Sequence, residues 1–261
     1  MMVNQKEKKK VKFRVSFLFL FVFASFAVCF ALYMKEDFEI TPDMVELAED
    51  AVVYIEPVGT GNSTINPVPG SERAGEEHYS DAVFIGSTAL AGLSDNGYVK
   101  SENMLLSDSI TLKNFNTVIL SVNGVESGIA DAAVRKAPGK IYIMVGMDEV
   151  GSGGGESRFS ELEAFIESVQ EKSGETKIYL MSLLPVTAES ESRIAMNSDI
   201  DLYNSELLDF ANKMNVFYLD VNTAFKGNDG KLPASYTEVN GVKLTESGYR
   251  QLSEYILTHV G

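Results

Sequence analysis

The residue types that most often carry out enzyme chemistry are scarce in this sequence. It contains two histidines, His78 and His259, and one cysteine, Cys29. Histidine is the usual general base, and histidine and cysteine are the commonest protein ligands of zinc. A single cysteine also prevents a disulfide bond within one chain. We therefore predict no metal site and no bound cofactor, and expect any acid–base chemistry to depend on other side chains.

Other polar groups occupy positions where a site could form. Each follows an apolar run of strand length or precedes the last predicted helix, and they are Ser87, Thr88, Asp148, Asn240 and Lys243. A hydroxyl group is a poor nucleophile near neutral pH, so any covalent chemistry at Ser87 or Thr88 needs a base within hydrogen-bond reach. Lys243 could act as that base only if burial brought the pKa of its ammonium group far below the usual value.

The elements that must position these groups alternate between strand and helix. Apolar, β-rich runs occur at residues 82–85, 117–122, 140–145, 177–182 and 216–219. Helical patterns occur at residues 129–136, 159–172, 200–214 and 246–259. This alternation predicts an α/β domain with a parallel sheet and helices on both faces. Ligands of such sheets bind beyond the carboxyl ends of the strands, which is where most of these polar residues are expected.

The amino-terminal region has the pattern of a membrane anchor. Residues 15–34 are an unbroken run of apolar or small residues, long enough to cross the hydrocarbon core as a helix. Six basic residues lie within residues 1–14, which predicts a cytoplasmic tail there and an extracellular carboxyl-terminal domain. A cleaved signal peptide is the alternative, although the run is longer than a usual signal core and no clear cleavage site follows. We therefore predict a single-pass protein of the cell membrane.

Residues 35–80 have the composition of a connecting segment. A short helix is expected to begin at Thr41, which precedes Pro42. Residues 56–77 are rich in glycine, proline, serine and asparagine, as linkers are. We place the folded domain at residues 81–261.

The charge of the chain excludes one class of partner. The formal net charge is −15 although residues 1–14 are basic, so the rest of the chain is strongly acidic. An acidic surface repels phosphate backbones, and we predict no binding to nucleic acids. Solubility is an alternative and simpler reason for the charge.

Four segments of the predicted domain resemble the motifs of the SGNH (GDSL-like) hydrolases. The family patterns are F-I-G-D-S-x-x-x-G-L, G-x-N-D/E, S-x-L-P-V-T and D-G-x-H-L-T-x-x-G-Y. This sequence has F-I-G-S-T-A-L-A-G-L at 84–93, G-M-D-E at 146–149, S-L-L-P-V-T at 182–187 and N-G-V-K-L-T-E-S-G-Y at 240–249. The resemblance implies a three-layer α/β/α, flavodoxin-like fold with a mostly five-stranded parallel sheet, and a family of ester hydrolases.

The resemblance also assigns a position to the nucleophile. The family's serine precedes a glycine by four residues, and Thr88 precedes Gly92 by four. If Ser87 were the nucleophile instead, that glycine would be Ala91. Thr88 is therefore the positional equivalent of the serine, with a methyl group that stiffens and crowds its hydroxyl.

The other reactive positions are replaced as well. Lys243 stands where the family has its histidine base, Asn240 where it has the orienting aspartate, and Asp148 where it has the asparagine that helps to stabilise the oxyanion. An anion at that last position repels the developing negative charge unless it is protonated. The family's remaining oxyanion glycine has two candidates here, Gly124 and Gly128, each of which also fits a plain turn.

These replacements predict a catalytically degenerate domain, because the loss of a nucleophile or base from a serine triad costs about a millionfold in rate. The predicted function is to bind or organise a surface ligand such as an acylated glycan. The residues expected to shape its binding site are Gly86, Ser87, Gly146 and Asp148. Two alternatives remain: an active ester hydrolase that uses Thr88 and Lys243, and a module that binds a protein partner at the cell surface.

Overall fold

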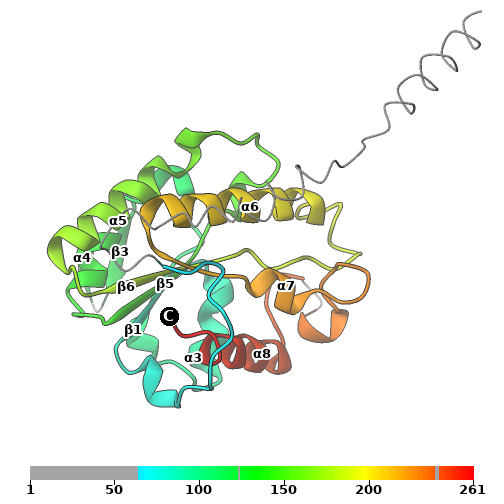
Figure 1. Ribbon diagram of the computed structural model, residues 1–261, viewed down its shortest axis with the longest axis horizontal. Helices are drawn as coiled ribbons and strands as arrows, with labels where there is room; N and C mark the ends of the chain where they lie inside the picture. Colours follow the sequence, from blue (N-terminus) through cyan, green and yellow to red (C-terminus); the bar gives the residue numbers. More distant parts are fainter. Residues whose placement is uncertain (1–63, 123, 239–240) are drawn as a thin grey trace, which may run out of the picture. The chain divides into compact units, whose positions relative to one another are not determined.

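Five parallel strands form the central sheet of the domain (Figure 1). The computed structural model describes residues 64–261 except 123, 239 and 240. The strands are β1 (Ala82–Gly86), β2 (Met104–Leu106), β5 (Lys140–Met144), β6 (Lys177–Met181) and β7 (Phe217–Leu219), in the order β2-β1-β5-β6-β7. Counted within the sheet alone this is the 2-1-3-4-5 order of flavodoxin-like folds, which bind ligands where the order reverses, between β1 and β5. The predicted α/β class and five-stranded parallel sheet are confirmed.

Helices cover both faces of this sheet. They are α3 (Gly92–Asp95), α4 (Ile129–Val134), α5 (Ser160–Lys172), α6 (Asn197–Met214), α7 (Val221–Phe225) and α8 (Glu246–Leu257). Figure 1 shows α4, α5 and α6 on one side of the strands, with α3 and α8 on the other. Alternate residues of a strand pack against the helices on opposite faces of the sheet, because successive side chains point to opposite faces. Val83 and Ile85 pack in the core with Phe165 of α5, whereas Phe84 packs in the core with Leu252 of α8.

One face of the sheet carries a row of stacked aromatic rings. Phe84, Tyr142, Tyr179 and Phe217 are register partners on four adjacent strands, and their ring centroids lie 4.7, 4.7 and 4.8 Å apart. This spacing is that of the strands themselves, so in-register pairing stacks each ring on the next. The stacked rings stabilise this register, which sets the positions of the loops at the ends of the strands.

The run at residues 117–122 does not belong to the sheet, contrary to its prediction as one of the alternating strands. Within it, β3 (Ile119–Val122) pairs antiparallel with β4 (Val125–Gly128) in a separate two-stranded sheet. The two strands are joined by the dipeptide at 123–124, whose sequence Asn-Gly is a strong local hairpin signal. The edge position in the sheet is taken by β2, which has only three residues and gives little periodic signal.

Residues 64–80 pack on the domain, although the sequence places them in the linker. The amide of Asn66 donates to the carbonyl of Val216 (2.8 Å) and its oxygen accepts from the backbone N–H of Tyr218 (2.7 Å). Val68 is buried, and Arg73 pairs with Glu254 of α8. The predicted anchor at 15–34 and the helix expected from Thr41 lie outside the described residues. Within residues 64–261, apart from the three gaps, no helix is long and apolar enough to cross a membrane.

The loop after β1 is held by the last helix of the chain. Gly92 lies against the ring of Tyr249, and a Cβ at position 92 would overlap that ring. The Tyr249 hydroxyl donates to the carbonyl of Ala89 (2.6 Å), one residue after Thr88. Gly92, the glycine used to align Thr88 with the family's serine, is therefore also the residue that lets Tyr249 of α8 pack against this loop.

We expect Gly92→Ala to lower the stability of the purified chain by about 1–3 kcal/mol, because the added methyl group forces the Tyr249 ring to move. The measurement is thermal unfolding, in which this loss lowers Tm by several degrees. Gly128→Ala is the matched control, since its nearest neighbour would be 4.0 Å from the new Cβ. An equal change in Tm for the two variants would contradict this account.

Candidate functional site

A pocket of about 290 Å³ opens at the carboxyl ends of β1, β5 and β6. Its wall includes Ser87 after β1, Gly146 and Asp148 after β5, Leu183 after β6 and Gly241 from the segment before α8. Residues of all four family-like motifs, including Ser87 and Ala89 on either side of Thr88, thus meet at one edge of the sheet, where its topology predicts a ligand site.

Two glycines give the pocket its backbone shape. A Cβ on Gly86 would lie 2.5 Å from the carbonyl oxygen of Met144 on the neighbouring strand. Gly146 has a φ of 111°, a left-handed conformation that favours glycine, and a Cβ there would overlap the Tyr203 hydroxyl. That hydroxyl donates to the carbonyl of Val145 (2.8 Å) and so fixes the end of β5.

The wall after β6 is an extended loop held by buried asparagines. Asn204 accepts from the N–H of Leu183 (2.8 Å) and donates to its carbonyl (2.9 Å). Asn197 makes the same two bonds to Val186, at 2.9 and 3.0 Å. Both asparagines lie in α6, so this helix satisfies loop groups that have no strand partner. Sequence reasoning missed these positioning residues, because asparagines within a helical pattern carry no distinct signal.

Thr88 forms hydrogen bonds with a residue that none of the sequence motifs contains. Its hydroxyl lies 2.7 and 2.8 Å from the two carboxylate oxygens of Asp108, and its backbone N–H donates to the first of them (2.9 Å). The strand register explains the contact. Gly86 pairs with Leu106, so Thr88 and Asp108 each lie two residues beyond the last pair of β1 and β2. The only sequence signal was an acid shortly after a very short apolar run.

These bonds set the charge state of Asp108. Hydrogen bonds from the Thr88 hydroxyl and then its N–H lower the pKa of this carboxyl, and the positive charge of Lys243 lowers it further. Asp108 is therefore a carboxylate throughout the neutral range and a weaker base than an ordinary aspartate. The neighbouring Ser87 lies at the pocket wall, and its hydroxyl accepts from the N–H of Ala89 (3.4 Å).

Asp148 has the opposite environment. It lies exposed at the rim of the pocket, but its carboxyl loses part of its hydration there, which raises its pKa. No other side chain among the described residues hydrogen-bonds or pairs with it. Its neighbour Glu149 is buried, pairs with Lys113 (2.7 Å) and accepts from the Ser152 hydroxyl (2.9 Å). The pairing of Glu149 fixes the short turn η5 (Met147–Glu149) that holds Asp148 at the rim.

Lys243 and Asn240 occupy the segment before α8. Asn240 lies outside the described residues. The carbonyl of Lys243 accepts from the N–H of Glu238 and the hydroxyl of Thr237, both at 2.9 Å, while its side chain is exposed. Its positive charge contributes to the lowered pKa of Asp108, after the hydrogen bonds from Thr88.

Each of the two histidines contacts a tyrosine, and neither is among the residues that line the pocket. The His78 Nε2 atom lies 2.8 Å from the Tyr142 hydroxyl, just before the amino end of β1, where burial and then the charge of Lys140 lower its pKa. His259 stacks on Tyr255 of α8 with ring centroids 3.8 Å apart. Within the described part of the chain, no group of three or more histidine, cysteine or acidic side chains could hold a metal ion.

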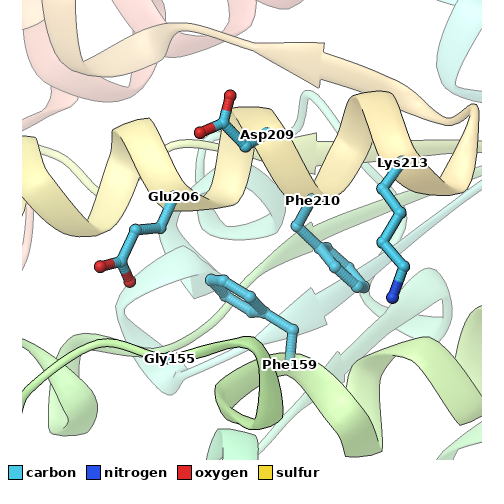
Figure 2. Close-up of a pocket in the computed structure, with 6 residues that line it drawn as sticks. All are labelled: Gly155, Phe159, Glu206, Asp209, Phe210 and Lys213. Carbon is cyan, nitrogen blue, oxygen red and sulfur yellow. The ribbon is translucent and has the colours of Figure 1, made fainter.

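The two glycines that the resemblance offers as oxyanion donors are not among the residues that line the pocket. Gly124 and Gly128 belong to the β3–β4 hairpin, where Gly124 has a φ of 77° as a turn glycine does. The glycine-rich loop at residues 151–155 borders a different groove, of about 500 Å³, between η6 (Glu156–Phe159) and α6. Figure 2 shows Gly155 and Phe159 across this groove from Phe210 of α6. None of residues 151–155 is among the described residues that line the pocket at the strand ends.

The environments of the two aspartates predict opposite effects on stability. The raised pKa of Asp148 means that its ionisation costs stability above that pKa, so Asp148→Asn should raise Tm at neutral pH, by at most about 2 °C for so exposed a group. The difference should vanish below the ordinary carboxyl pKa, where the wild-type group is protonated in both states. Asp108→Ala, which removes an ion held by hydrogen bonds, should lower Tm at neutral pH. Thermal unfolding from acid to neutral pH measures both, and a lower Tm for Asp148→Asn at neutral pH would contradict this account.

Comparison with known proteins supports the sequence resemblance. The sequence model of the GDSL-like lipase/acylhydrolase family matches residues 86–251, more than half of the chain. None of the curated protein sequences compared with the chain matches it. A Streptococcus pneumonia protein provisionally assigned as a platelet activating factor has a similar fold, with 21% identity, a TM-score of 0.52 and coverage of 67% of this chain and 81% of that one. A GDSL-like lipase from Bacteroides thetaiotaomicron gives 19% identity and a TM-score of 0.49, over 67% of this chain and 84% of that one. The chain belongs to the GDSL-like lipase/acylhydrolase family.

Proposed function

We propose that this domain is a non-hydrolytic member of its family that binds an acylated glycan at the cell surface. The observation that carries the proposal is the double contact of Thr88 with Asp108, through its N–H (2.9 Å) and its hydroxyl (2.7 Å to the nearer oxygen). Each contact removes one requirement of acyl transfer.

The first requirement is an activated nucleophile. The hydrogen of the Thr88 hydroxyl points to Asp108, a carboxylate whose pKa is lowered and which is therefore a poor proton acceptor. A general base works best when its pKa lies near the working pH, and Asp108 is shifted away from it. Thr88 consequently remains an alcohol.

The second requirement is a set of donors for the oxyanion. The N–H of the nucleophilic residue is a common donor in acyl-transfer enzymes, and that of Thr88 is already taken by an anion. Asp148 supplies an acceptor at the rim where the family has an amide donor. Loss of one such donor costs about 10²–10³ in kcat, which adds to the penalty for the missing base.

The pocket itself retains the features of a binding site. It has a mostly apolar lining with a few polar groups, a combination typical of sites for small organic ligands. Leu183 and Val186 offer an apolar surface to an acyl group, and the carboxylates of Asp108 and Asp148 can accept hydrogen bonds from sugar hydroxyls. The membership of the chain in a family of acylhydrolases supports an acylated ligand.

The full-length chain, purified in detergent, should bind acetylated glycans without hydrolysing them. Release of acetate from acetylated oligosaccharides and of nitrophenol from nitrophenyl acetate should be no faster than with Thr88→Ala. Ser87→Trp, which adds a large side chain to the exposed wall of the pocket, should abolish glycan binding, and Asp209→Asn in the groove of Figure 2 should retain it. Turnover that is lost in Thr88→Ala, or glycan binding that is unaffected by Ser87→Trp, would overturn the proposal.

A second candidate is ester hydrolysis by a rewired site of Thr88 and Lys243. The observation in its favour is that the positive charge of Lys243 lowers the pKa of Asp108, the residue that accepts the Thr88 hydrogen bonds. This candidate gives a different result in the same assay. Hydrolysis would rise with pH as the amine loses its proton, and Lys243→Ala would abolish it.

We also propose that residues 15–34 anchor the chain and that the domain faces outward. With an epitope tag at each end, protease added to intact cells should remove the carboxyl-terminal tag and leave the amino-terminal tag intact. The mass of the purified chain should include residues 1–34. Protection of the carboxyl-terminal tag would show the opposite orientation, and a mature chain that lacks the amino-terminal tag would show a cleaved signal peptide instead.

A further inference from the structure

The unusual feature of the pocket is a carboxyl group at its rim, that of Asp148, to which no other described side chain donates a hydrogen bond. Asp148 and Glu149 are adjacent in sequence, and Glu149 has both Lys113 (2.7 Å) and Ser152 (2.9 Å) as partners. Asp148 lines the pocket, and no other described side chain pairs with it. Lys113 thus forms its ion pair with the buried Glu149, whereas Asp148 at the pocket feels the charge of this lysine without a hydrogen bond to it.

The charged side chains in the wall of the pocket have one sign, although the positive charge of Lys243 also acts on one of them, Asp108. Among the described residues that line it, only Asp108 and Asp148 are charged, and both are acids. The long-range field acts in the same direction, because residues 64–261 contain 28 aspartates and glutamates against 15 lysines and arginines. Such a field concentrates cations and repels anions at a cleft of this kind.

The rest of the wall is apolar and limits the size of the ligand. Ile110, Met144, Leu183 and Val186 all line the pocket, whose volume is about 290 Å³. A purely cationic ligand would gain nothing from this surface, and a purely apolar one would desolvate Asp148 further without offering it a hydrogen bond. The wall is complementary to a small apolar group that has a positive charge close beside it.

We propose that the pocket is selective for an aminoacyl group, whose ammonium nitrogen pairs with Asp148 while its short apolar side chain packs between Leu183 and Val186. This inference rests on the proposed binding function and names the class of acyl group. Hydrogen bonds between an ammonium and a carboxylate are about twice as strong as those between neutral groups, so the charge decides between this group and a plain acetyl group. Asp108 contributes a second negative charge and binds Thr88 at the same time.

A pair of small esters tests the proposal. Alanine ethyl ester and ethyl propionate have nearly the same shape, and only the first carries an ammonium group. Titration calorimetry with the full-length chain in detergent, near pH 6 where the amine is protonated, should show alanine ethyl ester binding at least about tenfold more tightly. Asp148→Asn should remove this difference without unfolding the chain. Asp209→Asn, which removes an equal charge from the groove of Figure 2, should keep it.

The possible results separate this inference from the function on which it rests. Equal affinity for the two esters, together with glycan binding that Ser87→Trp abolishes, would overturn the aminoacyl inference and leave the proposed function in place. A preference for alanine ethyl ester that Asp148→Asn and Asp209→Asn reduce equally would show a diffuse effect of charge and would also overturn it. Failure of both esters and of acetylated glycans to bind would overturn both proposals.

Discussion

A hydroxyl group has one hydrogen to donate, and the site is organised around where Thr88 donates it. Both polar hydrogens of this residue, on the hydroxyl and on the amide, are directed to Asp108. The contact follows from the pairing of β1 with β2, which brings the second residue after each strand face to face. No special loop is needed to make it. The pairing of Thr88 with Asp108 therefore follows from the register of the two strands.

The shape of the site and its reactivity depend on different parts of the sequence. The shape depends on steric requirements: Gly86 lies against a neighbouring carbonyl, and Gly146 adopts a left-handed backbone. The reactivity depends on side chains that project into the pocket, which can change without disturbing the backbone. This separation explains how a chain can keep the fold of its family while the side chains at the edge of the sheet differ.

Much of the architecture could be predicted from sequence, for identifiable reasons. The strands β1, β5 and β6 are buried on both faces and are therefore read as continuous apolar runs, and the long helices α5 and α6 show clear helical periodicity. The errors arose where local pairing competes with the sheet. β2 is too short to be distinguished from a loop, and the run at 117–122 has the composition of a sheet strand, although the Asn-Gly turn after it favours a local hairpin.

The site was less predictable than the fold, because its central contact joins residues that no motif connects. The spacing of Thr88 from Gly92 could be read directly, but Asp108 becomes visible only once the order of the strands is known. The asparagines of α6 that support the β6 loop are hidden for a similar reason. Their role depends on a loop that is distant in sequence and adjacent in space.

The bond from the Tyr249 hydroxyl to the carbonyl of Ala89 spans 160 residues. It ties the loop that carries Thr88 to the last helix of the chain, so the loop reaches its final position only after almost the whole polypeptide is available. During synthesis, the segment around Thr88 leaves the ribosome before α8 has been made. The pocket is therefore among the last parts of the domain to be completed, and a chain that stops before Tyr249 lacks the contact that holds this loop in place.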